Sequence, residues 1–318
     1  MSLFSFALFR SIPGDPVDVL MGNSLKDIPQ GKLSALRKEF GLNEPFAKQY
    51  LVWLGGFVGR GELGRSYRDG QPVLAVIGER IAPTIALTGT ALIFAFVGGI
   101  AFGLLLSYLS TLKWPIFFRI FYIATLIIYS TPSFYLALIA LFAFTQWTSL
   151  VPVLAFNDPG QASTPIDFLS HVILPALVLA SRRGAKVALF IKTSITDELS
   201  KQYVITALSK GLSMEMVIVK HVFKNSLMPV VSLLGLSLPA LLGGSVLVET
   251  IFAWPGLGRL AVESTFGRNY PVLLALTVIY GCLVVLSNLV ADLISQWINP
   301  RLKNSSESGK SISVYAKT

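Results

Sequence analysis

Few charged residues interrupt the long apolar stretches of this sequence, and one group of them could bind an anion. Arg182, Arg183 and Lys186 stand within the apolar stretch 166–191. Guanidinium and ammonium groups pair with carboxylates, so the trio could line a water-filled path for a carboxylate-bearing solute. As a helix the stretch would be roughly 39 Å long, which exceeds the roughly 30 Å hydrocarbon core of a bilayer. The trio could therefore instead lie at the inner interface, with its long side chains reaching the headgroups.

A basic, amphipathic insert covers residues 203–229, between two apolar stretches. Its pattern predicts a short helix, a turn at Gly211 and a second helix. Glycine takes the left-handed backbone conformation at no steric cost, so Gly211 would end the first helix. Thr206 and Ala207 are small and would let that helix lie close against another backbone. We interpret the insert as a docking element for a partner protein.

The second helix of the insert would carry an apolar face. The residues that recur at helical spacing are Met214, Val217, Ile218 and Val222. Such a face could enter a groove on a partner, or it could lie in the lipid interface.

Several glycines and one carboxylate in the apolar stretches are further candidates for a path or gate. The glycines are Gly98, Gly99, Gly103, Gly243 and Gly244. They would permit close helix packing or a flexible point in a gate. Glu249 would stand at the outer end of its stretch, where it could contact a partner or the solute, or form a solvated helix end.

Enzyme chemistry finds little support in these residues. The sequence holds no Gly-x-x-x-x-Gly-Lys-Ser/Thr phosphate loop, so we expect no ATPase of its own and an external source of energy. With two histidines and one cysteine no zinc-ligand set can be assembled, so we expect no metal and no cofactor. His221 would pack or cap within the insert.

The composition indicates an integral membrane protein. Hydrophobic residues make up 53% of the 318 and charged residues 14%, whereas roughly a quarter of an ordinary soluble domain is charged. The net charge of +9 does not indicate a nucleic-acid partner, because the 26 Lys and Arg residues are scattered among loops and show no aromatic-interleaved groove. We expect membrane lipid around the protein and no nucleic acid.

Five apolar stretches are long enough to cross a bilayer as helices, which takes about 20 residues. They are residues 83–109, 115–147, 166–191, 227–250 and 271–298. Residues 1–12 are apolar apart from Arg10 but too short, so we expect the end of a truncated first span, with an interfacial or re-entrant piece as the alternative. The expected architecture is an all-α membrane bundle of about six transmembrane helices.

Loop charges set the expected orientation, because Lys and Arg are retained on the cytoplasmic side near span ends. Residues 182–224 hold eight basic and three acidic side chains, whereas residues 147–165 hold no basic one. The loop 194–227 is therefore expected in the cytoplasm, as is the tail 299–318, whose composition is typical of disorder. Segment 13–82 is then extracytoplasmic and 83–298 form the transmembrane domain.

The extracytoplasmic segment is expected to fold into a small cap. One helix would cover residues 32–40 and end at Gly41. A second would cover 45–57 and end at the Gly55-Gly56 pair.

Several short motifs stand in a fixed order along nearly the whole chain. They are Pro13-Gly14-Asp15-Pro16, Gly41-Leu42-Asn43-Glu44-Pro45, Leu63-Gly64-Arg65-Ser66-Tyr67, Ser130-Thr131-Pro132-Ser133-Phe134, Leu174-Pro175-Ala176, Phe252-Ala253-Trp254-Pro255-Gly256-Leu257-Gly258 and Asn299-Pro300-Arg301. The insert adds Tyr203-Val204, Thr206-Ala207, Lys210-Gly211-Leu212, His221, Asn225 and Pro229. In order and spacing the chain resembles the permeases of binding-protein-dependent ABC transporters, in the dipeptide, oligopeptide and nickel subgroup.

The resemblance implies a fold, a set of partners and a mechanism. The fold is a type I ABC permease of six spans in the bacterial inner membrane. The partners are a sister permease, two ATP-binding subunits and an extracytoplasmic solute-binding protein. The coupling residues would be Tyr203, Thr206, Ala207, Lys210, Gly211, Leu212, His221 and Asn225. Closure of the ATPase pair would rock the channel between inward-open and outward-open states.

The implied cargo is short peptides, with nickel or opine-metal chelates as the alternative, because the loop that contains Trp254 and Pro255 also resembles that of such permeases. A self-contained secondary transporter would need inverted repeats, which are not evident. The chain departs from the family pattern at Ile205, where the general coupling motif has glutamate before Ala-Ala, so we expect docking to depend more on shape. Asn299 replaces the aspartate that usually precedes Pro-Arg.

Overall fold

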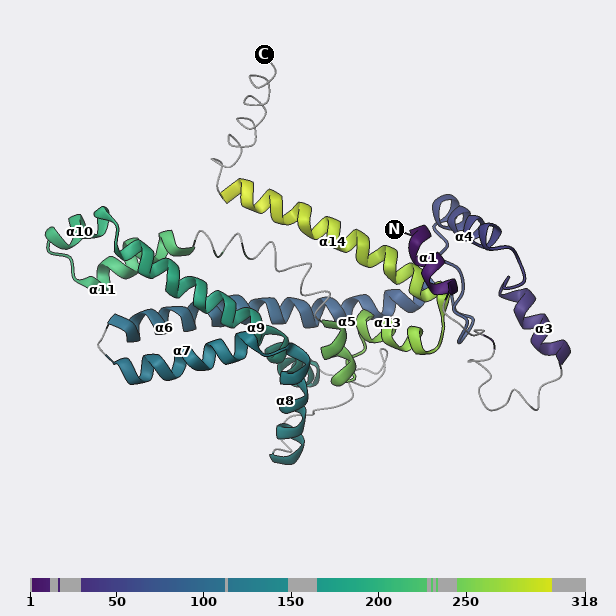
Figure 1. Cartoon of the computed structure of the whole chain (residues 1–318), viewed down its shortest axis with the longest axis horizontal. Helices are drawn as coiled ribbons and strands as arrows, with labels where there is room; N and C mark the ends of the chain where they lie inside the picture. Colours follow the sequence, from purple (N-terminus) through teal and green to yellow (C-terminus); the bar gives the residue numbers. More distant parts are fainter. Residues whose placement is uncertain are drawn as a thin grey trace, which may run out of the picture. The chain divides into compact units, whose positions relative to one another are not determined.

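In a computed structural model the chain is described at residues 2–11, 17, 30–111, 114–147, 165–227, 230, 233 and 245–298, which are almost entirely helical (Figure 1). Within these ranges the only β interaction is an isolated antiparallel bridge between Arg65 and Pro72. The expected all-α class is confirmed. Expected features at residues 13–16, 243–244 and 299–318 lie outside the described residues.

The described chain contains a series of helices and two π-helical turns. They are α1 (Ser2–Ser11), α3 (Gln30–Glu39), α4 (Phe46–Arg60), α5 (Val73–Ile93), η2 (Phe94–Gly98), α6 (Gly99–Thr111), α7 (Pro115–Ser130), α8 (Ser133–Trp147), α9 (Pro165–Leu199), α10 (Gln202–Ser209), α11 (Met214–Val217), η3 (Ile218–Val222), α13 (Leu257–Phe266) and α14 (Tyr270–Ile298). They belong to two compact units. Unit 1 comprises Met1–Ala86, Pro152–His171 and Ser245–Leu283, and unit 2 comprises Leu87–Val151, Val172–Gly244 and Val284–Thr318.

Two helices in the described part of the chain are long and apolar enough to cross a membrane. One is the continuous helix Val73–Thr111 of 39 residues, formed by α5, η2 and α6, and the other is Tyr270–Val290 within α14. The first begins ten residues before the expected span, so Pro83 lies inside the helix. Proline has no N–H to donate, but its carbonyl still accepts, and here it receives the indole N–H of Trp254 at 2.9 Å.

The apolar stretch 115–147, which we expected to cross as one helix, is broken into α7 and α8 with a bend of 110°. The break lies at Pro132, because a residue before proline is driven out of the helical region, and Thr131 is indeed extended at ψ 131°. Tyr129 O, in the last turn before the break, accepts Arg182 Nε at 3.3 Å. Ile127 O keeps its helical bond from the N–H of Thr131 at 2.9 Å and also accepts the Thr131 hydroxyl at 2.7 Å.

The two expected helices of the N-terminal segment form, but one ends later than expected. α3 ends before Gly41, which has φ +64° and whose next residue donates its N–H to Arg37 O, as predicted. α4 runs through Gly55-Gly56 and ends at Gly61, with φ +67°. Glycine with ordinary helical angles costs a helix only about 1 kcal/mol, so the pair did not have to end it. The helix ends instead at Gly61, because the left-handed conformation of this glycine directs its own N–H and that of Glu62 to the carbonyls of Phe57 and Gly56.

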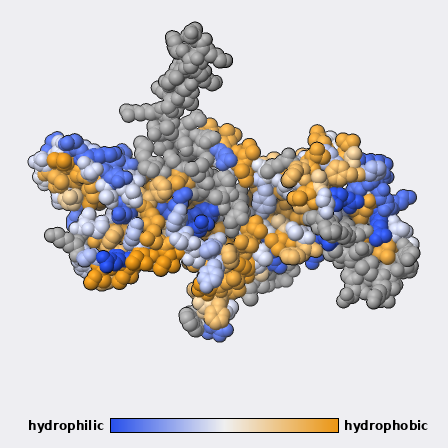
Figure 2. Space-filling model, in the orientation of Figure 1, coloured by the Kyte–Doolittle hydropathy of each residue, from blue (hydrophilic) through white to orange (hydrophobic). Residues whose placement is uncertain are grey.

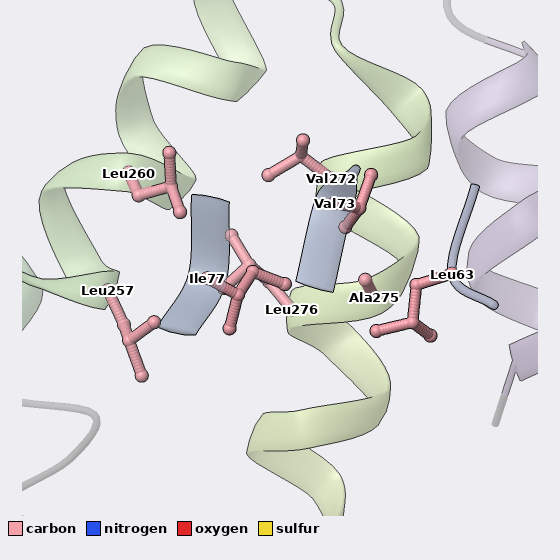
Figure 3. Packing of buried hydrophobic residues seen from close by; sticks show 8 residues of the cluster. All are labelled: Leu63, Val73, Ile77, Leu257, Leu260, Val272, Ala275 and Leu276. Carbon is pink, nitrogen blue, oxygen red and sulfur yellow. The ribbon is translucent and has the colours of Figure 1, made fainter. Parts of the chain in front are cut away.

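A compact apolar core holds unit 1 together (Figure 3). It joins α5, α13 and α14 because each helix contributes residues three or four apart, which share one face. The buried residues are Leu63, Val73, Ile77, Leu257, Leu260, Val272, Ala275 and Leu276.

In unit 2, α6 packs closely on α9 through two glycines. A Cβ placed on Gly99 would lie 2.7 Å from Gly184 O, and one on Gly103 would lie 2.7 Å from Ala188 O. Gly98 would meet nothing within 4 Å. Of the two roles expected for these glycines, the structure therefore assigns close packing to Gly99 and Gly103.

Large apolar side chains remain exposed over much of the surface (Figure 2). On α7, Ile116 is 70% exposed and Ile120 57%, and on α8 Phe142 is 67% exposed. Such extensive apolar surface is covered in membrane proteins by lipid or by partner subunits.

We expect Gly103→Ala to destabilise the protein by about 1–3 kcal/mol, because the added methyl group would have to displace the α9 backbone. The thermal unfolding midpoint in detergent measures this. Gly98→Ala is the matched control and should leave the midpoint unchanged or slightly raised. Equal midpoints for the two variants would contradict the packing.

Candidate functional site

The insert folds as a helix, a glycine turn and a second helix, as the sequence predicts. α10 ends at Lys210, and Leu212 donates its N–H to Ala207 O at 3.4 Å, which closes the turn. Gly211 has φ +85°. The hydroxyl of Ser213 then accepts the N–H of Met216 at 3.3 Å and starts α11.

Glycine is required at position 211 because of its backbone conformation and not because of a lack of space for a side chain. A Cβ at this position would meet nothing within 4 Å. A side chain is disfavoured at φ +85° by contact with its own backbone, and most strongly when it branches at Cβ. The angle between the two helices of the insert therefore depends on this one residue.

The apolar face expected on the second helix is only partly available to a partner. Val217 and Val222 are completely buried within the chain, and Val204 and Ala207 on α10 are almost completely buried. The exposed apolar residues are instead Ile205, Met214, Met216 and Val219. The prediction of a partner-binding stripe through Val217 and Val222 was wrong, because helical spacing identifies a face but not what covers it.

The coupling candidates divide between this outer surface and the base of the loop. Thr206, Lys210 and Gly211 are exposed, and Leu212 and His221 are half-buried. Ala207 packs inward.

Tyr203 and Asn225 meet at the base of the loop around Glu198, which the sequence analysis missed. Tyr203 donates its hydroxyl hydrogen to Glu198 Oε2 at 2.7 Å, and Lys201 Nζ donates to Oε1. Asn225 bonds to both Glu198 and Tyr203. The cluster therefore ties the end of α9 to both ends of the loop. The only sequence signal for it was the Glu198–Lys201 spacing, which is common on helix surfaces.

The cluster stabilises the ionised form of Glu198. Partial burial acts to raise the pKa of this carboxyl, but hydrogen bonds from Lys201, Tyr203 and Asn225 outweigh it and hold the pKa below its ordinary value of 4.5. Stabilisation of the loop by this group is therefore fully present above pH 4.5 and is lost as the pH falls through the lowered pKa.

The basic trio in α9 is spread around the helix. Arg182 is exposed and bonds to Tyr129 O, and Lys186 is exposed with Nζ 6.0 Å from the centroid of the Phe190 ring. Arg183 is half-buried. The trio therefore does not form one anion-binding cluster, although Arg182 and Lys186, four residues apart, share a face.

Glu249 lies in the interior of unit 1, away from any solvated helix end. Its side chain is completely buried and accepts the N–H groups of Gly258 at 2.7 Å and Arg259 at 3.2 Å. These N–H groups open α13, so the carboxylate also faces the positive end of the helix. Thr84 on α5 connects Glu249 to the start of α13, since its hydroxyl donates to Glu249 Oε1 at 3.1 Å and accepts the N–H of Leu257 at 2.8 Å.

The surroundings of Glu249 leave no room for side chains on the loop that it holds. A Cβ at Gly256 would lie 2.3 Å from Glu249 Oε2, and one at Gly258 would lie 2.5 Å from Val246 Cα. The Phe252-to-Gly258 motif is therefore a closely packed clasp between α5 and α13. We assign Glu249 to this clasp.

Family comparisons identify the class of protein. The family described as "Binding-protein-dependent transport system inner membrane component" matches residues 99–304. The chain belongs to this family. A second family description, for the N-terminal part of such membrane components, matches residues 1–88. The chain is thus a multi-pass permease of the ABC transporter class in the plasma membrane.

Three relatives illustrate the similarity. The chain is 35% identical to the oligopeptide transport system permease protein AppB of Bacillus subtilis (strain 168), over 95% of this chain and 94% of AppB. It is 32% identical, with the same coverage of each chain, to the dipeptide transport system permease protein DppB of Alkalihalophilus pseudofirmus. The glutathione transport system permease protein GsiC of Escherichia coli (strain K12) is also 32% identical, over 95% of this chain and 94% of GsiC.

Solved structures confirm the permease fold. An inward-facing MetNI methionine ABC transporter gives a TM-score of 0.56 at 17% identity, covering 71% of this chain and 97% of that chain. An amino acid ABC transporter with histidines gives a TM-score of 0.53 at 17% identity, covering 70% and 94%.

We expect Glu198→Gln to accelerate amide hydrogen exchange across residues 202–209 by roughly threefold to tenfold at neutral pH, because the hydrogen bonds lose their charge assistance at a partly exposed site. Asp197→Asn, which removes the same charge from the neighbouring exposed position, is the control. Equal exchange in both variants would show that the cluster does not hold the loop.

We expect Glu249→Ala to lower stability by about 2–3 kcal/mol, because two N–H groups at the start of α13, one buried and one partly buried, lose their acceptor. Glu263→Ala, which removes an ion pair with Arg259 at a side chain 32% exposed, should cost less than about 1 kcal/mol. Thermal unfolding of both variants in detergent gives the comparison. A small loss for Glu249→Ala would refute the clasp.

Proposed function

We propose that this permease forms the translocation path of an importer for short peptides. The observation that carries the proposal is the combination of family membership with near full-length similarity to permeases named for oligopeptides, dipeptides and glutathione. Glutathione is itself a tripeptide, so these three names share one cargo class. They favour peptides over nickel or opine-metal chelates.

The energy for transport comes from separate subunits in this proposal. Two ATPases bind at the insert, a sister permease completes the path, and an extracytoplasmic solute-binding protein delivers the peptide. The family name itself implies the solute-binding protein. No phosphate-loop motif occurs in the sequence, which supports the absence of an ATPase activity of its own.

The two faces of the insert suit it to transmit motion. Exposed Ile205, Met214 and Met216 present apolar surface to the ATPase, in agreement with docking that depends on shape at Ile205. Buried Val204 and Val217 and the Glu198 cluster attach the insert to its own unit. A push on the outer surface would therefore move the end of α9, which is continuous from Pro165 to Leu199.

Residues of the path are proposed from their placement on α9. Arg182 and Lys186 share an exposed face and carry the charge that a peptide carboxylate would require. Arg183 is a weaker candidate because it is half-buried. Gly243 and Gly244 remain gate candidates from the sequence.

We expect Gly211→Val to abolish peptide uptake in proteoliposomes and to uncouple ATP hydrolysis from the solute-binding protein, while membrane insertion stays normal. A β-branched residue at φ +85° would alter the turn and so the angle between α10 and α11. Uptake and ATPase rates of the complete assembly are the measurements.

Gly211→Asn is the matched control, because asparagine tolerates the left-handed conformation. It should retain most of the uptake. Normal uptake by Gly211→Val, or equal loss in both variants, would remove the turn from the coupling mechanism.

A further inference from the structure

A cavity of about 760 Å³ opens in unit 1, between the segment expected outside the membrane and the helix ends that adjoin it. Sites for small molecules commonly have volumes of 300–1,000 Å³. Residues of α1, α4, the turn after α3, the bridge region around Arg65 and the start of α14 line it. Neither the coupling loop nor the path candidates contribute to it.

One wall of the cavity is aromatic and held in place by hydrogen bonds. Tyr67 stacks on Phe40 at 4.3 Å between ring centroids and meets Tyr270 edge-on at 6.5 Å. Asn269 fixes this wall from behind, because its Oδ1 accepts the N–H of Tyr67 at 3.0 Å and its Nδ2 donates to the hydroxyl of Ser66 at 2.9 Å. The rings are therefore preorganised to receive an apolar side chain.

The lining carries an excess of positive charge that the acidic side chains among the described residues do not neutralise. Four basic side chains and two carboxylates line the cavity. The two carboxylates are already engaged, Glu44 by Lys48 at 3.0 Å and Glu62 by Arg60 at 3.5 Å.

The other two basic residues, Arg10 and Arg65, bond only to backbone carbonyls among the described residues. Arg10 Nη2 donates to Leu42 O at 2.9 Å and Arg65 Nη1 to Gly70 O at 3.0 Å. Each guanidinium keeps further N–H groups for a ligand, and a guanidinium is the side chain best suited to bind a carboxylate in a forked geometry.

Trp53 adds an unsatisfied donor to the same lining. Its indole N–H is buried and has no hydrogen-bond partner in the described structure. A buried donor without a partner costs free energy that a bound acceptor would recover. Tyr67 offers a further hydroxyl, since burial raises its pKa to about 12, against the effect of nearby Arg10, and keeps it neutral at physiological pH.

We propose that this cavity is an extracytoplasmic binding site for a short peptide, with Arg10 and Arg65 receiving its C-terminal carboxylate and the aromatic wall receiving an apolar side chain. The inference rests on the proposed function, because a site that holds peptide at the outer face contributes to transport only if the permease imports peptides. Such a site would hold peptide at the permease before it enters the path.

Equilibrium dialysis tests the site on the purified complete transporter, without nucleotide and without the solute-binding protein. The probes are radiolabelled alanyl-phenylalanine and the same dipeptide with an amidated C-terminus. We expect the free acid to bind about tenfold more tightly than the amide, because the amide cannot make charge-assisted bonds to guanidinium. Absence of binding, or equal binding of both probes, would overturn the proposal.

Arginine variants locate the binding. Arg65→Gln and Arg10→Gln should each weaken binding of the free acid about tenfold. Arg68→Gln makes the same change in charge at a residue outside the cavity lining, 73% exposed and 3.8 Å from Glu263, and should leave binding unchanged. Arg65→Lys should retain more binding than Arg65→Gln, which separates loss of charge from loss of fold. If Arg65→Gln binds like Arg68→Gln, the peptide does not occupy this cavity.

The same preparation distinguishes the two proposals. ATP-driven uptake of alanyl-phenylalanine in the presence of the solute-binding protein reports on import alone. Uptake without binding to the isolated transporter would refute the cavity site and leave the import function standing. If Arg65→Gln weakens only the affinity for the solute-binding protein, the cavity receives that protein and not the peptide, which also overturns the proposal.

Discussion

Backbone N–H and C=O groups that enter hydrocarbon must be hydrogen-bonded within the protein, and the structure follows this constraint at two helix interruptions among the described residues. At the Pro132 break the carbonyl of Tyr129 accepts the guanidinium of Arg182. At the start of α13 the buried carboxylate of Glu249 accepts two N–H groups. A charged residue within an apolar stretch can thus serve to bind backbone groups, without any contact with solute. We therefore assign Glu249, which the sequence made a path candidate, to the stabilisation of the fold.

The bilayer also determines how helices can associate. In a bilayer, apolar side chains gain little by leaving lipid for each other, so helices associate through tight backbone approach and hydrogen bonds. Gly99 and Gly103 allow that approach between α6 and α9. α9 is therefore held along part of its length by backbone contact and at its end by the Glu198 cluster. A helix restrained in this way can transmit a displacement of the insert, because few side chains are free to rearrange and absorb the motion.

The insert combines a rigid attachment with an exposed apolar surface. Its buried valines and the polar cluster attach it to its own unit, and Ile205, Met214 and Met216 remain for a partner. Methionine is adaptable and suits a surface that must stay bound while a partner changes shape. The glycine turn sets the angle at which this surface is presented. The N-terminal cavity differs from the insert, because Asn269 fixes its aromatic wall and, among the described residues, Arg10 and Arg65 pair with no carboxylate.

Much of this protein is determined by its sequence alone. The apolar stretches, the distribution of basic residues and the left-handed glycines at 41 and 211 are local signals, and local backbone energetics decide them in the structure as well. The tertiary structure alone decided that Val217 and Val222 face inward, that Glu249 bonds to Thr84, and that Glu198 bonds to Asn225. Those outcomes depend on which surfaces meet and which donors lie within 3 Å or so of an acceptor. Helical periodicity gives the direction of a side chain, but it carries no information on what the chain brings opposite to it.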